Sequence, residues 1–141
     1  MLRFAGYINI LIAIGHLVGL IWAHQLFEIT GIGKEMQELS AIHASLPYLL
    51  TIFVAIAFFV FGLYGLSAGN KFRKLPFQKL AIFSIAGIYI FRGIGELTAD
   101  TLQSTNSATE TMYSVVALFI GLLFLFGGFK KWKNKQHISQ T

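Results

Sequence analysis

Residues 46–67 read LPYLLTIFVAIAFFVFGLYGLS and carry no charged side chain. A helix needs about 20 mostly apolar residues to cross a hydrocarbon core about 30 Å thick. Irregular backbone cannot face lipid, because its polar groups would lack hydrogen-bond partners, so a spanning run of this kind must be helical. The basic turn 70–75, NKFRKL, follows two residues later. This stretch therefore predicts a transmembrane helix that ends at one membrane surface.

Three other segments have the same apolar character and a length close to that of a membrane span. We therefore expect an all-α fold, an integral membrane four-helix bundle formed by one domain over residues 1–141. The expected spans are about 4–27, 46–67, 76–98 and 111–129, and residues 130–141 form a basic cytoplasmic tail. After the first span, Met36, Leu39 and Ile42 recur every three residues, which indicates a short helix on the membrane interface. A flexible loop is the alternative for that segment.

The composition agrees with a lipid environment. Hydrophobic residues make up 55% of the 141 residues and charged residues 12%, whereas soluble domains carry about 25% charged residues. With so little polar surface, the chain must have the lipid bilayer as its partner. The formal charge of +5 does not indicate nucleic-acid binding, because the basic residues cluster at the membrane boundaries. The absence of Cys excludes disulfides, thiolate nucleophiles and iron–sulfur ligation.

The charged residues alternate along the chain between two sides of the expected bilayer. All six acidic residues lie in or beside the loops 29–45 and 100–108. Nine of the eleven Lys and Arg residues lie on the opposite side: Arg3, Lys71, Arg73, Lys74, Lys79, Lys130, Lys131, Lys133 and Lys135. Since cytoplasmic loops carry the excess of Lys and Arg, we expect a bacterial inner-membrane protein with both termini in the cytoplasm.

A few ionisable groups lie where lipid is expected. His24 and Glu28 are one helical turn apart on the first span, and a polar stripe follows one face of the third span. At 1.5 Å per residue, His24 and Glu96 both lie roughly 12 Å outward from the centres of their parallel spans. Intramembrane charge is expected to face the bundle interior or a wet cavity. The sequence thus predicts an outward-facing pocket lined by His24, Glu28, Tyr89, Arg92, Glu96 and Asp100, with His16 and His43 as additional candidates.

The residue types in this expected pocket favour an anionic ligand. The planar, permanently charged guanidinium of Arg92 suits a carboxylate or phosphate. Histidine titrates near neutral pH, so His16 or His24 could couple binding to protons. We therefore expect a protein that binds or conducts a small anionic or zwitterionic solute or a lipid headgroup. An enzymatic activity stays open, because no Ser is convincingly placed beside a base and its orienting carboxylate.

A metal site is the main alternative, and it would make the protein a metal-dependent membrane enzyme. His24, Glu28, Glu96 and Asp100 supply imidazole and carboxylate ligands for a divalent metal. The chain lacks the Glu-x-x-His motif of carboxylate di-metal bundles, and Arg92 would repel a cation. Haem is disfavoured, because His16 or His24 would have to face His43 as an axial pair from opposed helices.

A purely structural role is the remaining alternative. Arg92 and Glu96 are four residues apart and could neutralise one another within one helix. Gly15 and Gly19 form a small-xxx-small pattern that allows another helix to approach closely, with His16 bonding across the contact. In this case the protein would be an accessory subunit without a ligand. Either way, association with a second copy or with another membrane protein is expected.

Overall fold

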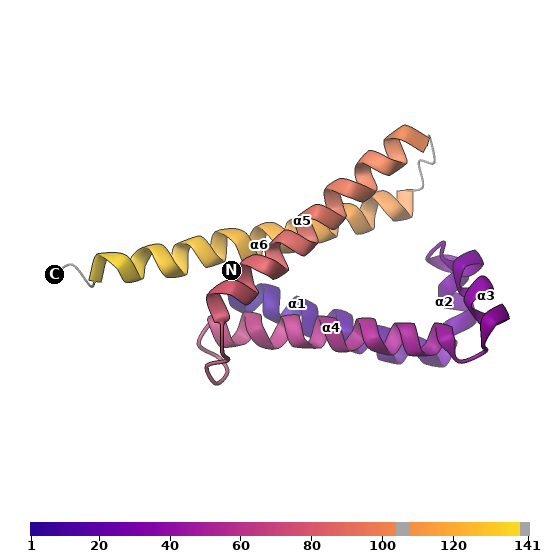
Figure 1. The fold of residues 1–141 in the computed structure, drawn as a ribbon, viewed down its shortest axis with the longest axis horizontal. Coiled ribbons are helices and arrows are strands. Elements are labelled where there is room, and N and C mark those ends of the chain that lie inside the picture. Colours follow the sequence, from indigo (N-terminus) through magenta and orange to yellow (C-terminus); the bar gives the residue numbers. More distant parts are fainter. Residues whose placement is uncertain (104–107, 139–141) are drawn as a thin grey trace.

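The computed structural model describes the backbone of residues 1–103 and 108–138, and the side chains of these ranges except at 24, 100–103, 109–110 and 134–138. The elements run in the order α1 Leu2–Gly19, the 3-10 turn η1 Leu20–Trp22, α2 Ala23–Ile29, α3 Gly33–Ile42, α4 Leu46–Ala68, α5 Gln78–Gln103 and α6 Ala108–Ile138 (Figure 1). No strand occurs in the described ranges. The prediction of an all-helical fold is therefore confirmed.

Within residues 1–103 and 108–138, four helical stretches are long and apolar enough to cross a membrane, with mean hydropathies between 1.6 and 2.5. These stretches are Leu2–Trp22, Leu46–Ala68, Gln78–Ala99 and Thr111–Lys133. Each matches one of the expected spans, and together they indicate an integral membrane protein. Helix α6 continues to Ile138, so it includes most of the basic segment that was expected to be a tail.

The ends of the helices differ from the sequence expectation at two points. The first span does not run on to residue 27: α1 ends at Gly19, and η1 and the seven-residue α2 follow it. At Trp22 the backbone leaves the helical region, with φ −118° and ψ 36°. The third helix begins at Gln78 and not at Pro76, because Phe77 takes a left-handed φ of 51° that no α-helix continues.

The segment between the first two spans forms a helix, α3, rather than a flexible loop. Its Met36 and Leu39 are partly buried and its Glu35 and Glu38 are exposed. Ile42 departs from this pattern, with 77% of its surface exposed. The apolar repeat therefore identified the helix, but not all three members of the buried face.

The helices form two antiparallel hairpins, α1 with α4 and α5 with α6 (Figure 1). Backbone contact between small residues joins the first pair. A Cβ added at Gly6 would lie 2.8 Å from the backbone nitrogen of Leu66 and 2.9 Å from the carbonyl oxygen of Gly62. Small residues allow membrane helices to approach in this way. The expected contact at Gly15 is wrong within this chain, because a Cβ there would meet nothing within 4 Å.

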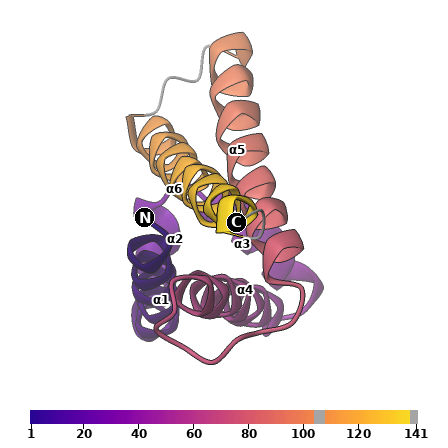
Figure 2. The same cartoon turned by 90° about the vertical axis from the view of Figure 1, so that its left-hand side faces the viewer.

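The two hairpins meet at one end and diverge towards the other, where α2 and α3 lie (Figures 1 and 2). The core is gathered where they meet and includes Leu2, Ala5, Ile82, Ile85, Tyr89 and Phe124. Polar contacts reinforce this end: Arg3 Nε donates to the Gly69 carbonyl at 2.5 Å, and Lys131 Nζ donates to the Ala68 carbonyl at 2.6 Å. We call it the basic end, because the nine clustered Lys and Arg residues belong to its segments.

Candidate functional site

Arg92 and Glu96 occupy successive turns of α5, inside the stretch that is apolar enough to cross a membrane. Arg92 Nη2 lies 2.9 Å from Glu96 Oε1, so the two side chains form an ion pair. The side chain of Arg92 is 56% exposed and that of Glu96 is 39% exposed. The spacing of four residues therefore brings the charges together, as the sequence suggested, but it does not bury them.

Helix α6 holds the other oxygen of the carboxylate. The Ser114 hydroxyl donates to Glu96 Oε2 at 3.1 Å, and Ser114 itself is fully buried. The two helices are tightly packed here, since a Cβ on Gly93 would lie 2.9 Å from the Ser114 carbonyl oxygen. Glu96 is thus oriented from both helices of its hairpin. Sequence reasoning missed Ser114, although it is the last polar residue of the fourth span before Lys130.

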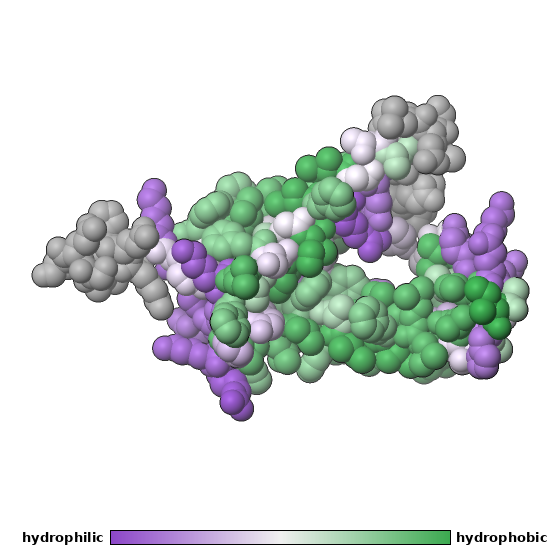
Figure 3. Space-filling view, in the orientation of Figure 1, coloured by the Kyte–Doolittle hydropathy of each residue, from purple (hydrophilic) through white to green (hydrophobic). Residues whose placement is uncertain are grey.

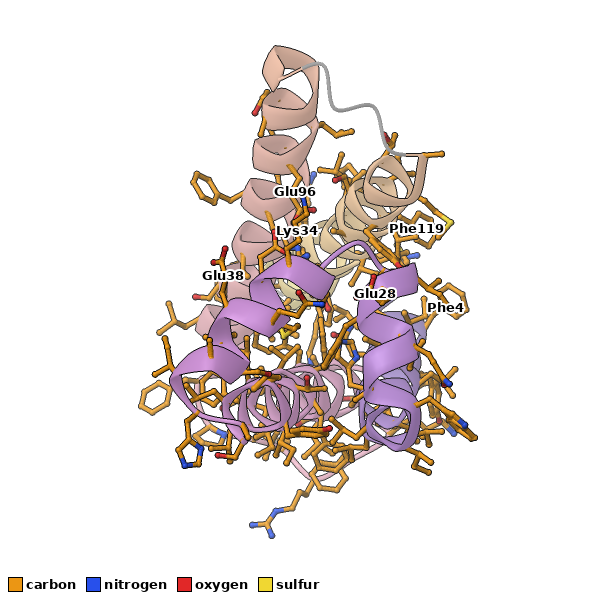
Figure 4. All side chains as sticks on the ribbon, turned by 90° about the vertical axis from the view of Figure 1, so that its right-hand side faces the viewer. Phe4, Glu28, Lys34, Glu38, Glu96 and Phe119 are labelled. Carbon is orange, nitrogen blue, oxygen red and sulfur yellow. The ribbon has the colours of Figure 1, made fainter. Side chains whose placement is uncertain are left out.

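The ion pair borders the space between the diverging hairpins, which we call the inter-hairpin hollow. Figure 3 shows this hollow between the two hairpins, with hydrophilic side chains on the α5–α6 side of it. In Figure 4, which looks into the divergent end, Glu96 lies on the side of α5 that faces α6 and the other hairpin. Because Arg92 forms an ion pair with Glu96, the Arg92 guanidinium also lies beside the hollow.

Tyr89 lies one turn closer to the basic end, and its hydroxyl is already engaged. It donates to Asn9 Oδ1 at 2.5 Å, and Asn9 Nδ2 donates to the Ala5 carbonyl at 2.8 Å. Both side chains are buried, and rings of Phe58, Phe61 and Phe124 surround Tyr89. Tyr89 therefore joins the two hairpins below the hollow and does not present its hydroxyl to it. Asn9, the one amide of α1, was missing from the expected site.

The Glu28 carboxylate lies against the start of α3 and does not contact Glu96. A Cβ on Gly33 would lie 2.7 Å from Glu28 Oε1, so the carboxylate rests against the first residue of α3. A helix N-terminus carries partial positive charge, which favours a carboxylate there. Figure 4 shows Glu28, Lys34 and Glu38 on α2 and α3 at the divergent end. The side chains of His24 and Asp100 lie outside those that the structure describes.

The other two histidines have local partners. His16 Nδ1 donates to the Ile12 carbonyl at 2.8 Å, and its ring lies 5.1 Å from that of Phe58. His43 follows α3 at an exposed turn, where its Nδ1 accepts from the Ser45 hydroxyl at 2.8 Å and from the Ser45 N–H at 3.3 Å. The structure thus places His16 on the α1–α4 hairpin and His43 in the connection to α4, and it brings neither to the Arg92–Glu96 pair.

A metal site has little support from the described side chains. They contain no group of three or more His, Asp or Glu residues that could hold a metal ion. The expected ligands Glu28 and Glu96 have separate neighbours, Gly33 for the first and Arg92 with Ser114 for the second. A metal site would therefore depend on His24 and Asp100, whose side chains are not among those that the structure describes.

The fold and the site define a class, a small four-helix integral membrane protein with an exposed ion pair inside one span. No family model, curated protein or solved structure matches the chain.

Proposed function

We propose that the protein binds a small anionic or zwitterionic solute, or a lipid headgroup with the same groups, in the inter-hairpin hollow, with Arg92 as the contact for the anion. The exposure of the Arg92–Glu96 pair, 56% and 39% within a span, supports this most directly. A lipid-facing charge costs about 2.5–3.5 kcal/mol on insertion scales. Ser114 holds Glu96 from α6, and the pair borders the hollow, with Arg92 as its more exposed member.

The donor groups of Arg92 support an anion contact. A guanidinium carries five N–H donors in a planar fork, and the ion pair with Glu96 engages one of its terminal nitrogens. A carboxylate or phosphate accepts two parallel hydrogen bonds from such a fork. Glu96 would then place a negative charge beside an ammonium group of the same ligand. The pair therefore favours a zwitterion over a simple anion.

The charge distribution supports an orientation for this site. Nine of the eleven Lys and Arg residues belong to the segments of the basic end, and basic loops are retained in the cytoplasm. In our proposal both termini are cytoplasmic, the membrane is a bacterial inner membrane, and the hollow opens outward. Helix α3 would then lie at the outer interface, with Glu35 and Glu38 towards water.

We also propose that ligand binding is coupled to the uptake or release of a proton. His16 Nδ1 donates to the backbone, so the neutral ring keeps Nε2 as an acceptor for a proton. Histidine is the side chain that ordinarily changes charge between pH 5 and 8. In our proposal ligand binding is coupled to a proton through a histidine, so binding would differ between the two ends of this pH range.

Thermal unfolding of the purified protein tests the proposal. The probes are glycine betaine, succinate and a short-chain phosphatidylethanolamine, each titrated between pH 5 and 8. A ligand present at 100 times its Kd stabilises the folded state by about 2.7 kcal/mol, so at least one probe should raise Tm. The variant Arg92→Leu/Glu96→Leu should lose this shift.

The matched control is Phe91→Ala, which alters an 83% exposed apolar side chain on the same helix and should keep the shift. A shift that persists in Arg92→Leu/Glu96→Leu would contradict the proposal, as would the lack of a shift with every probe. Stoichiometric zinc or iron in the purified protein would instead favour the metal-dependent enzyme.

A further inference from the structure

A second feature lies at the basic end, away from the inter-hairpin hollow. A groove of about 620 Å³ runs between the start of α5 and the last turns of α6. Its lining residues are Lys79, Phe83, Phe129, Trp132 and Lys133, and we call it the aromatic groove. Its volume falls in the range of about 300–1,000 Å³ that is typical of small-molecule sites.

The aromatic groove is ordered by contacts between its rings. The ring centroid of Phe83 lies 5.1 Å from that of Phe129 and 5.9 Å from that of Trp132. On the same turn, Lys131 Nζ lies 5.3 Å from the Trp132 ring centroid and donates to the Ala68 carbonyl. Lys131 therefore fixes the indole from the side of α4. The ring of Phe83 thus joins the α5 side of the groove to Phe129 and Trp132 on α6.

The charged and apolar groups of the groove are arranged in two levels. Lys79 precedes Phe83 by one turn of α5, and Lys133 follows Phe129 by one turn of α6. Both displacements point towards the same end of the antiparallel hairpin, so the two lysines lie at the mouth and the rings of Phe83 and Phe129 lie deeper, with Trp132 at the level of Lys133. This order matches a phospholipid, whose charged phosphate lies at the surface above an apolar chain. Trp at the boundary is also typical of a membrane interface.

The sequence supplies no carboxylate to neutralise these lysines. All six Asp and Glu residues lie between 28 and 38 or between 96 and 110, in segments that lead to or from the divergent end. Lys79 and Lys133 are both exposed. The two exposed ammonium groups beside the aromatic rings are therefore complementary in charge to an anion from outside the chain. Basic pockets of this kind between membrane helices bind anionic lipid headgroups.

We infer that the aromatic groove binds one anionic phospholipid, with its phosphate between Lys79 and Lys133 and its acyl chain against Phe83 and Phe129. The inference does not depend on the proposed function of the Arg92–Glu96 pair, because the two sites share no residue. It assigns to α5 and α6 a lipid-binding role at the basic end.

Quenching of Trp132 fluorescence by brominated lipids tests this assignment. The chain has two Trp residues, so Trp22→Phe leaves Trp132 as the reporter in the full-length protein. The protein is reconstituted in phosphatidylcholine vesicles that contain brominated phosphatidylglycerol or, at the same mole fraction, brominated phosphatidylcholine. We expect stronger quenching by the anionic lipid, and this preference should weaken as salt screens the lysines.

The decisive variant is Lys79→Gln/Lys133→Gln, and Lys71→Gln/Lys74→Gln is its control, because it removes the same charge from the loop outside the groove. A lysine near an anionic membrane contributes about a fivefold preference, so the first variant should lower the relative binding constant about fivefold for each lysine. The control should lose less of the preference, because Lys71 and Lys74 act on the lipid only through the general surface charge. If both variants lost the preference for the anionic lipid equally, general surface charge would explain it, and the inference would be overturned. Equal quenching by the two lipids in the parent would also overturn it, as would reversal of the quenching by soluble glycerol phosphate.

Discussion

The Ser114 hydroxyl of α6 donates a hydrogen bond to Glu96 Oε2 of α5 at 3.1 Å, while Arg92 holds Oε1 of the same carboxylate at 2.9 Å. Glu96 is therefore fixed by two helices, and Arg92 is fixed by Glu96. This relationship holds Arg92 of a candidate membrane-spanning helix at the edge of the inter-hairpin hollow and outside the buried core. The function that we propose depends on it.

Removal of Arg92 should destabilise the protein through its partner. Arg92→Leu leaves one oxygen of the carboxylate without its cation, and an unsatisfied polar group costs about 1–3 kcal/mol. We expect a loss in this range and not the 3–5 kcal/mol of a fully buried pair, because the side chains are 56% and 39% exposed. Unfolding in detergent should show that Arg92→Leu/Glu96→Leu recovers most of this loss. Equal stability of the single and the double variant would contradict the coupling.

The Tyr89–Asn9 hydrogen bond should stabilise the junction of the hairpins. Tyr89→Phe removes the donor to Asn9 Oδ1 in a buried site, which should lower the free energy of unfolding by about 1–3 kcal/mol. Combining it with Asn9→Leu should restore much of the loss, because both polar partners are then absent. A double-mutant cycle measures this coupling, and additive effects of the two substitutions would argue against it.

Two glycine substitutions should distinguish the real helix contact from the one expected from sequence. A Cβ on Gly65 would lie 2.8–3.0 Å from backbone atoms of Gly6 and Leu2, which cannot move without shifting α1. Gly65→Ala should therefore cost about 1–3 kcal/mol through overpacking. Gly15→Ala, where a Cβ meets nothing within 4 Å, should be neutral or stabilising by up to about 1 kcal/mol. Thermal melts that rank the two variants in the opposite order would refute the α1–α4 contact.

The sequence was informative about each helix by itself. The absence of charge in residues 46–67 located α4, and the spacing of Arg92 and Glu96 indicated their ion pair. These features are local, since they depend on a transmembrane length or on one turn of helix. The sequence also indicated a helix after the first span, because the apolar repeat at Met36 and Leu39 is local as well.

The relations between helices could not be read in the same way. His24 and Glu28 would lie near the depth of Glu96 only on one straight helix over residues 4–27, but α1 ends at Gly19 and the backbone at Trp22 is not helical. A shared depth also requires parallel spans, whereas the hairpins diverge (Figure 1). Which glycines make close contacts could not be predicted either, because Gly6 and Gly15 look alike in sequence. The burial of Tyr89 against Asn9 depends on the same packing.

The most direct test of the account asks whether Arg92 faces water from outside the cell. The chain contains no Cys, so Arg92→Cys introduces a single thiol, and Phe91→Cys introduces one at the neighbouring position of α5, where the side chain is 83% exposed. A charged, membrane-impermeant thiol reagent reacts with the thiolate, which needs water. The account predicts that the reagent, added to intact cells, labels the variant at residue 92 and leaves the lipid-facing variant at residue 91 unlabelled. Failure to label residue 92 from outside, or equal labelling of both, would contradict an outward-opening hollow that contains Arg92.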